Sequence, residues 1–219
     1  MDDLHTINDA INRRAGRKLG PSILVSLSLI ALVWFSLAYE PVIFAALVTI
    51  AVSLGIREIS RAFAEAKTNI STNALILATI GLSAATWQGG VAGLAVATAV
   101  ALPVLLINLL RNGPAGFVAS ATATTLVLVY LPFLAGFLIL LSHESNGLAQ
   151  VMTFVILVGC NDTFGYLVGV LLGKHPMAPT ISPKKSWEGL VGSITFTVAG
   201  GAIAFHSLLH IHWCIGAIV

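Results

Sequence analysis

Seven long apolar runs, joined by short polar connections, constrain the fold of this chain more than any other feature. They lie at about 19–39, 41–56, 73–87, 90–110, 116–141, 149–172 and 190–209. A helix needs about 20 residues to cross the hydrocarbon core of a bilayer. Because that core offers no water, a spanning segment must satisfy its own backbone hydrogen bonds, as a helix does. The pattern predicts an all-α fold, a polytopic transmembrane helical bundle of about seven spans.

Composition agrees with a chain that is surrounded mainly by lipid. Hydrophobic residues make up 57% of the 219 residues and charged residues only 9%, whereas a soluble domain carries roughly 25% charged residues. The formal net charge of +2 is too small to indicate binding of a nucleic acid. Membrane lipids are therefore the expected surroundings, and nucleic acid is not an expected partner.

The first 18 residues differ from the rest of the chain. They are polar, but Leu4, Ile7 and Ile11 recur at helical spacing, which is typical of an amphipathic helix lying on a membrane surface. We therefore expect two parts: residues 1–18 as a cytoplasmic amphipathic segment, and residues 19–219 as a single transmembrane domain.

The basic residues are confined to alternate connections between the apolar runs. All 11 fall before the first run or after the second, fourth and sixth: Arg13, Arg14, Arg17, Lys18, Arg57, Arg61, Lys67, Arg111, Lys174, Lys184 and Lys185. Because Lys and Arg concentrate in cytoplasmic loops, the N-terminus and the loop 173–189 are predicted to be cytoplasmic. The expected location is the cell inner (plasma) membrane, as a multi-pass protein.

An eighth apolar run begins at Trp213. The seven residues to Val219 are too few to cross a bilayer. We therefore expect the sequence to be the front part of a longer protein, truncated within its eighth span.

The sixth run carries a carboxylate near its middle. An ionised Asp162 at that depth costs at least a few kcal/mol, so it should face a wet cavity or a partner. Gly165, Gly169 and Gly173 lie on the same helical face, where a repeated small residue lets another helix approach closely. A packing role explains the glycines. For Asp162, a functional role and a simple hydrogen bond to a neighbouring span are the two alternatives.

The loop 173–189 combines three prolines with three lysines and two serines. The prolines prevent a continuous helix, and lysine, serine hydroxyl and free backbone N–H groups can together hold a phosphate. The alternative is that the lysines only anchor the topology and that Trp187 lies in the interfacial aromatic belt, with Glu188 paired to a lysine.

The order of these motifs favours a functional role for Asp162 and the loop 173–189 over a purely structural one. Asn-Asp-Thr-Phe-Gly-Tyr at 161–166, Gly173-Lys174-His175, and Ser-Pro-Lys-Lys-Ser-Trp-Glu-Gly at 182–189 resemble the phosphatidate cytidylyltransferase (CDP-diacylglycerol synthase) family. Gly165 replaces the alanine that is usual in that family. The family's downstream signature, which carries further metal-binding carboxylates, has no counterpart in this sequence, so activity of this chain alone is in doubt.

The resemblance implies transfer of a cytidylyl group from CTP to phosphatidate, giving CDP-diacylglycerol and pyrophosphate. It implies Mg²⁺ as cofactor, with Asp162 as its ligand, CTP and phosphatidate as substrates, and a homodimer. Two rival functions stay open: a related enzyme that uses CTP on another lipid, and a transporter with Asp162 as its ion site. The expected site residues are, as catalytic groups, Asp162, Lys184 and Lys185, and as substrate-binding groups Lys174, Ser182, Ser186, Trp187 and Glu188.

The predicted topology can be tested with two inserted epitope tags. The connection around Ser145 contains no lysine or arginine, whereas the one around Thr180 contains three lysines. A tag at Ser145 should therefore react with antibody on intact cells, and a tag at Thr180 only after permeabilisation. The opposite labelling would overturn the orientation.

Overall fold

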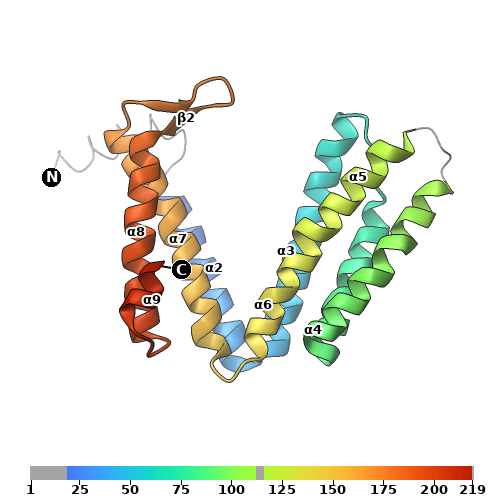
Figure 1. The fold of residues 1–219 in the computed structure, drawn as a ribbon, viewed down its shortest axis with the longest axis horizontal. Coiled ribbons are helices and arrows are strands. Elements are labelled where there is room, and N and C mark those ends of the chain that lie inside the picture. Colours follow the sequence, from blue (N-terminus) through green and yellow to red (C-terminus); the bar gives the residue numbers. More distant parts are fainter. Residues whose placement is uncertain (1–18, 112–115, 219) are drawn as a thin grey trace. The chain divides into compact units, whose positions relative to one another are not determined.

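The computed structural model describes residues 19–111 and 116–218, with the side chains of residues 19–23, 183 and 184 left out. The predicted amphipathic segment 1–18 lies outside the described residues. Figure 1 shows a chain built almost entirely of helices. They are α2 (Leu19–Tyr39), α3 (Pro41–Glu65), α4 (Thr72–Leu110), α5 (Phe117–Leu128), α6 (Leu134–His143), α7 (Gly147–Leu172), α8 (Trp187–Ser207) and α9 (Trp213–Ile218), with a π-helical turn, Val129–Phe133, between α5 and α6.

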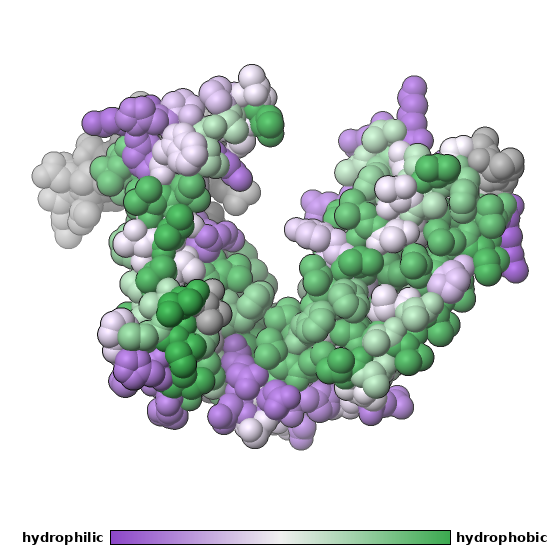
Figure 2. Space-filling model, viewed as in Figure 1, coloured by the Kyte–Doolittle hydropathy of each residue, from purple (hydrophilic) through white to green (hydrophobic). Residues whose placement is uncertain are grey.

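The helices coincide with the predicted apolar runs. Five helical stretches are long and apolar enough to cross a membrane, and α2 adds a shorter apolar helix from Leu24. Hydrophobic residues cover the sides of the helices, and hydrophilic residues gather near their ends (Figure 2). The prediction of an all-α polytopic membrane protein is therefore confirmed, while the exact number of spans and their orientation stay predictions.

Helix α4 contains two of the predicted runs, and Gly90 separates them. Gly90 has φ 57° and ψ −140°, a backbone conformation that is open essentially to glycine alone. The two arms then run back along each other, because Asn108 near the end of the second arm donates a hydrogen bond to Ser71, which precedes the first (3.2 Å). The single 39-residue helix is thus a helical hairpin, as the break between the runs 73–87 and 90–110 predicts.

Contacts divide the chain into two compact units, Ser36–Gly147 in one and Leu148–Val219 with the residues up to Phe35 in the other. The prediction of a single transmembrane domain is not decided by this division. The core of the Ser36–Gly147 unit joins α3, both arms of α4 and α5. Its buried members are Ile56, Leu75, Leu82, Leu94, Leu105, Val127 and Leu128.

Many polar groups inside this unit find partners close by, although the buried hydroxyl of Thr124 on α5 has none among the described residues. Thr49 on α3 bonds both the carbonyl oxygen of Ala45 and the hydroxyl of Ser83 on α4 (2.7 and 2.8 Å), a type of interhelical link common between membrane helices. Pro132 lacks an N–H and lies in the π-helical turn, where the regular hydrogen-bond ladder is interrupted. The predicted runs therefore fold into helices whose exceptions have identifiable local causes.

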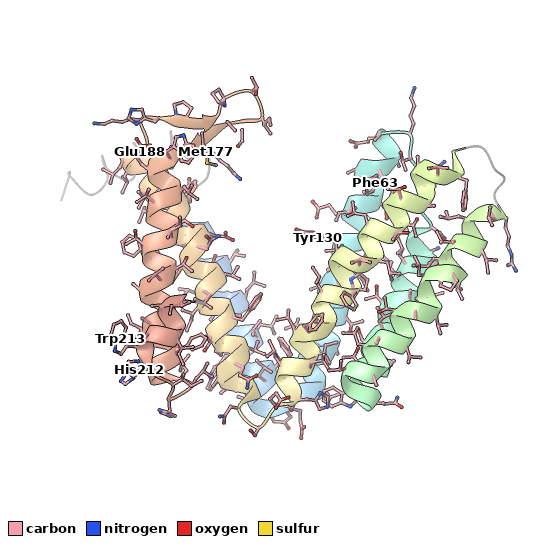
Figure 3. The ribbon with its side chains drawn as sticks, in the orientation of Figure 1. Phe63, Tyr130, Met177, Glu188, His212 and Trp213 are labelled. Atoms are coloured by element: carbon pink, nitrogen blue, oxygen red, sulfur yellow. The ribbon has the colours of Figure 1, made fainter. Side chains whose placement is uncertain are left out.

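The other unit contains α7, α8 and α9 and the loop between α7 and α8. That loop forms a small antiparallel hairpin of β1 (Pro176–Ala178) and β2 (Ser182–Ser186). The prolines had predicted an irregular loop without helix, and the hairpin is the local structure it adopts. The ends of α8 differ in environment: Glu188 and Met177 lie at the hairpin end, and His212 and Trp213 at the other (Figure 3).

The turn at Gly90 leads to a stability prediction with a matched control. Gly90→Ala forces an alanine into positive φ and should destabilise the protein by about 1–3 kcal/mol. Gly89→Ala adds the same methyl group at the neighbouring position, where φ is not positive and nothing lies within 4 Å, and should have little effect. Thermal unfolding in detergent measures both. Equal melting temperatures for the two variants would contradict the strained turn.

Candidate functional site

A cavity of about 770 Å³ lies between α7, the β-hairpin and the start of α8. Several predicted site residues line it, and all of its lining residues belong to the same compact unit. The lining residues are Asn161, Asp162, Gly165, Tyr166, Gly169, Val170, Gly173, Met177, Lys185, Ser186, Gly189, Leu190 and Ser193. The structure thus brings a mid-helix carboxylate and a basic loop to one cavity.

Glycine allows the two helices to approach each other at this cavity. A methyl group on Gly189 would lie 2.8 Å from the carbonyl oxygen of Gly165, too close for a carbon atom, and 3.2 Å from the Cα of Gly169, a tight contact. Phe164 of α7 and Phe196 of α8 stack beside this contact, with ring centroids 3.9 Å apart. The close helix approach that the glycine spacing predicted is confirmed, and its partner is α8.

Asp162 lies at one end of the cavity in a short chain of hydrogen bonds. The amide nitrogen of Asn161 donates to Oδ1 of Asp162 at 3.1 Å, and the hydroxyl of Ser193 donates to the amide oxygen of Asn161. An ionised carboxylate only accepts hydrogen bonds, which is consistent with the Asn161 nitrogen facing it. One carboxylate oxygen is therefore engaged with a neighbour, and Asp162 is exposed to the cavity.

Lys185 and Ser186 form the other end, where β2 passes into α8. The hydroxyl of Ser186 accepts from the N–H of Gly189 at 3.1 Å, so Ser186 is the N-cap of α8. Its own hydroxyl hydrogen remains able to donate. The backbone N–H of Trp187 already donates to the carbonyl oxygen of His175 (3.0 Å). The N–H groups of Gly189 and Trp187 are therefore engaged within the protein, and the phosphate-binding roles of Lys185 and Ser186 stay predictions.

A hydrogen-bonded pair closes the loop at its base. Nδ1 of His175 lies 2.6 Å from Oε1 of Glu188, and the backbone N–H of His175 donates to Oε2 at 3.3 Å. Glu188 is in the first turn of α8, where a negative charge is favoured by the helix dipole. The partner of Glu188 is thus a histidine, whereas the topology-anchor alternative paired it with a lysine.

Four other predicted residues whose side chains the structure describes, Lys174, Ser182, Trp187 and Glu188, do not line the cavity. Ser182 is half-buried and lies opposite Ala178 in the hairpin, and Lys174 and Trp187 are exposed. Lys184 lies on β2, but its side chain is outside the described part of the structure. The substrate-binding roles of Lys174, Ser182, Trp187 and Glu188 and the catalytic role of Lys184 stay predictions.

Sequence reasoning assigned no role to two residues of the site, Asn161 and Ser193, and placed the start of α8 three residues too late. The sequence holds a signal for Ser193 and for the start of α8. Ser186, Gly189 and Ser193 recur at i, i+3 and i+7, which puts them on one helical face if the helix begins at the serine. Ser186 followed by Glu188 in the first turn is also a helix-start pattern.

Comparison with known proteins shows the family of the chain. A sequence model of the Cytidylyltransferase family matches residues 22–219, which is most of the chain. The chain belongs to the cytidylyltransferase family. Two curated relatives of the chain are the phosphatidate cytidylyltransferases of Mycobacterium bovis and Mycobacterium tuberculosis strain H37Rv, each 34% identical over 197 residues and 83% of this chain.

The match extends over only part of those relatives. It spans 63% of the length of the Mycobacterium bovis protein and 59% of the Mycobacterium tuberculosis protein. A shorter match, 41% identical over 59 residues, joins 27% of this cytidylyltransferase to 23% of the phosphatidate cytidylyltransferase of Staphylococcus saprophyticus. No solved structure matches the chain.

The glycine contact predicts a sharp difference between two substitutions. Gly189→Ala places a methyl group against the backbone of α7, and overpacking of this kind typically costs about 1–3 kcal/mol. Gly159→Ala, on α7 itself, adds a methyl group where nothing lies within 4 Å and should be neutral or slightly stabilising. Thermal unfolding of the two purified variants tests the contact. If Gly189→Ala melts no lower than Gly159→Ala, the helices do not meet as closely as described.

Proposed function

We propose that this cytidylyltransferase transfers a cytidylyl group from CTP to phosphatidate, giving CDP-diacylglycerol and pyrophosphate. The cavity is the observation that carries the proposal, because it holds Asp162 at one end and Lys185 with Ser186 at the other. The curated relatives named phosphatidate cytidylyltransferase support the choice of substrates.

The reaction needs positioning and charge neutralisation more than covalent help from the protein. A phosphate oxygen of phosphatidate forms a bond to the α-phosphorus of CTP, and the bond from that phosphorus to pyrophosphate breaks. Charge develops on the phosphate oxygens as pyrophosphate leaves, and fixed positive groups stabilise it. Lys185 supplies such a charge at the cavity and Ser186 a neutral donor, and Lys184 next to them is proposed to act in the same way.

Asp162 fits a role in holding Mg²⁺. Magnesium in nucleotide sites is bound through one or two carboxylates, the substrate phosphates and several waters. Asp162 is exposed to the cavity and has one oxygen engaged by Asn161, so a single exposed carboxylate matches that ligand pattern. Within the described residues, no group of three or more His, Cys, Asp or Glu side chains forms a complete metal site. Magnesium, when bound, would supply charge neutralisation at the phosphates.

The surroundings of the cavity suit a lipid phosphate and a nucleotide together. Asp162 lies ten residues before the end of α7, about 15 Å along the helix axis, so the cavity reaches from the loop into the span. We place it at the cytoplasmic face of the inner (plasma) membrane, where CTP is available. A homodimer is proposed only from the family resemblance.

The proposed activity is tested by incubating the purified protein with labelled CTP, Mg²⁺ and phosphatidate in detergent. Labelled liponucleotide and free pyrophosphate are expected, and omission of phosphatidate should abolish both. The CTP in this arm is labelled in its cytidylyl group. A parallel arm contains a polyprenol in place of phosphatidate and CTP labelled at its γ-phosphate, because a polyprenol would receive that phosphoryl group while CDP leaves. Labelled product only in that arm would assign a different lipid substrate, and absence of labelled lipid in both arms would reject the transferase proposal.

Substitution of Asp162 tests its place in the site. Asp162→Asn removes the charge but keeps the shape of the side chain. We expect turnover to fall by about 100-fold or more, the usual loss when one electrostatic group is removed at a reacting centre. Glu144→Gln, which removes a carboxylate that does not line the cavity, is the matched control.

A second measurement separates metal binding from activity. Mn²⁺ prefers the same oxygen ligands as Mg²⁺, so its electron paramagnetic resonance spectrum reports binding directly. Asp162→Asn should weaken binding of Mn²⁺ in the presence of CTP, and Glu144→Gln should not. Wild-type turnover and Mn²⁺ binding in Asp162→Asn would remove Asp162 from the site.

A further inference from the structure

A second hollow lies between the two arms of the α4 hairpin, in the unit Ser36–Gly147. It has a volume of about 530 Å³ and shares no lining residue with the cavity around Asp162. Apart from two polar residues at one end, its walls are apolar. The lining residues are Ala74, Leu77, Ala78, Gly81, Leu82, Ala97, Val100, Ala101, Val104, Leu105, Ile107, Asn108 and Arg111, which we call the hairpin groove.

The hairpin groove exists because small residues face each other across the arms. Ala74, Ala78 and Gly81 line it from the first arm, and Ala97 and Ala101 from the second. At Gly81 even an added methyl group would meet nothing within 4 Å. An apolar space without contents loses dispersion contacts along its walls. In a membrane the molecules at hand to restore those contacts are lipid chains and other helices.

The polar end of the hairpin groove carries a positive charge without an internal counter-charge. Among the described residues, no carboxylate oxygen forms an ion pair with Arg111, since the single ion pair found there joins His175 and Glu188. The amide of Asn108 already donates to Ser71. Arg111 is exposed and follows the last residue of the second arm, where a helix leaves the hydrocarbon. A phosphate group is the anion available at that depth in a bilayer.

The length of the hairpin groove distinguishes a lipid chain from a second protein helix. From Ala97 to Arg111 the lining covers 14 residue steps of the second arm, or about 21 Å. One bilayer leaflet with its headgroup region is also about 21 Å thick, half of the usual 40–45 Å. A partner helix would lie along the whole hairpin, including the stretch near Gly90 that does not line the groove. We infer that the hairpin groove binds an anionic membrane phospholipid, with one acyl chain between the arms and its phosphate at Arg111.

Photo-crosslinking in lipid nanodiscs tests this site without any nucleotide, so its outcome is independent of the proposed transferase activity. Phosphatidylglycerol and phosphatidylcholine, each with a diazirine in the acyl chain, are incorporated separately and labelled peptides are identified by mass spectrometry. Label from phosphatidylglycerol should be concentrated on the residues of the two arms that line the groove. Label from phosphatidylcholine should be weaker there, because its headgroup has no net charge.

Two substitutions and a control test whether labelling depends on the charge of Arg111 and on the volume of the hairpin groove. Arg111→Gln should lower phosphatidylglycerol labelling by about fivefold, the value of one basic residue near an anionic headgroup, and leave phosphatidylcholine labelling unchanged. Arg57→Gln removes an exposed arginine that does not line the groove and should change neither. Gly81→Leu places a larger apolar side chain at a position where an added Cβ meets nothing within 4 Å, and it should lower labelling by both lipids.

The inference is overturned if the two lipids label the arms equally or if Arg111→Gln changes nothing. It is also overturned if Gly81→Leu converts a dimer to a monomer while lipid labelling persists, because the hairpin groove would then belong to a second copy of the chain. Thermal unfolding of each variant confirms that a loss of labelling does not come from a loss of fold.

Discussion

The bilayer core supplies no hydrogen bonds, and the rest of this structure follows from that constraint. Every polar group placed within a span must find its partner in the protein or face a wet space. Thr49 and Ser83 satisfy each other between α3 and α4, and several serine and threonine hydroxyls bond a carbonyl oxygen in the preceding turn. Asp162 is different, because its charge exceeds what the neighbouring Asn161 can satisfy. A carboxylate in that position is stable only beside a cavity that admits water or a cation.

The cavity around Asp162 is built from two different elements, the loop with its β-hairpin and the middle of α7. The hairpin of β1 and β2 brings Lys185 and Ser186 over the start of α8, and the pair His175–Glu188 joins the two ends of that loop at 2.6 Å. The carboxylate comes instead from the middle of α7. Lys185 lies on the loop and Asp162 in the middle of α7, and both line the same cavity. This separation of charges along one helix pair suits a reaction between a nucleotide and a lipid headgroup.

Much of the fold could be predicted from the sequence, because hydropathy reports directly on a membrane environment. The apolar runs coincide with helices, and the break at Gly89-Gly90 coincides with the turn of the hairpin. The glycine repeat on α7 predicted a close helix contact but could not name α8 as the partner, since the repeat says nothing about which small residues face it. Asp162, Lys185 and Ser186 were predicted as members of one site, and their common cavity depends on how the loop folds. The bond between Asn161 and Ser193 joins residues 32 positions apart, and no local pattern reports such a contact.

The glycines of α7 have a second effect beyond close packing, and it connects the fold to the site. Gly165, Gly169 and Gly173 line the cavity as well as lying against α8, the hairpin or the N-cap serine. A larger side chain at any of them would therefore both separate the helices and fill the space between Asp162 and Lys185. Helix α7 buries Val151 and Thr153 near its start, but from Phe154 to Leu172 none of its residues is buried. The three glycines leave one face of α7 without side chains at their positions. This face holds the carboxylate near α8 and leaves volume for a ligand beside it.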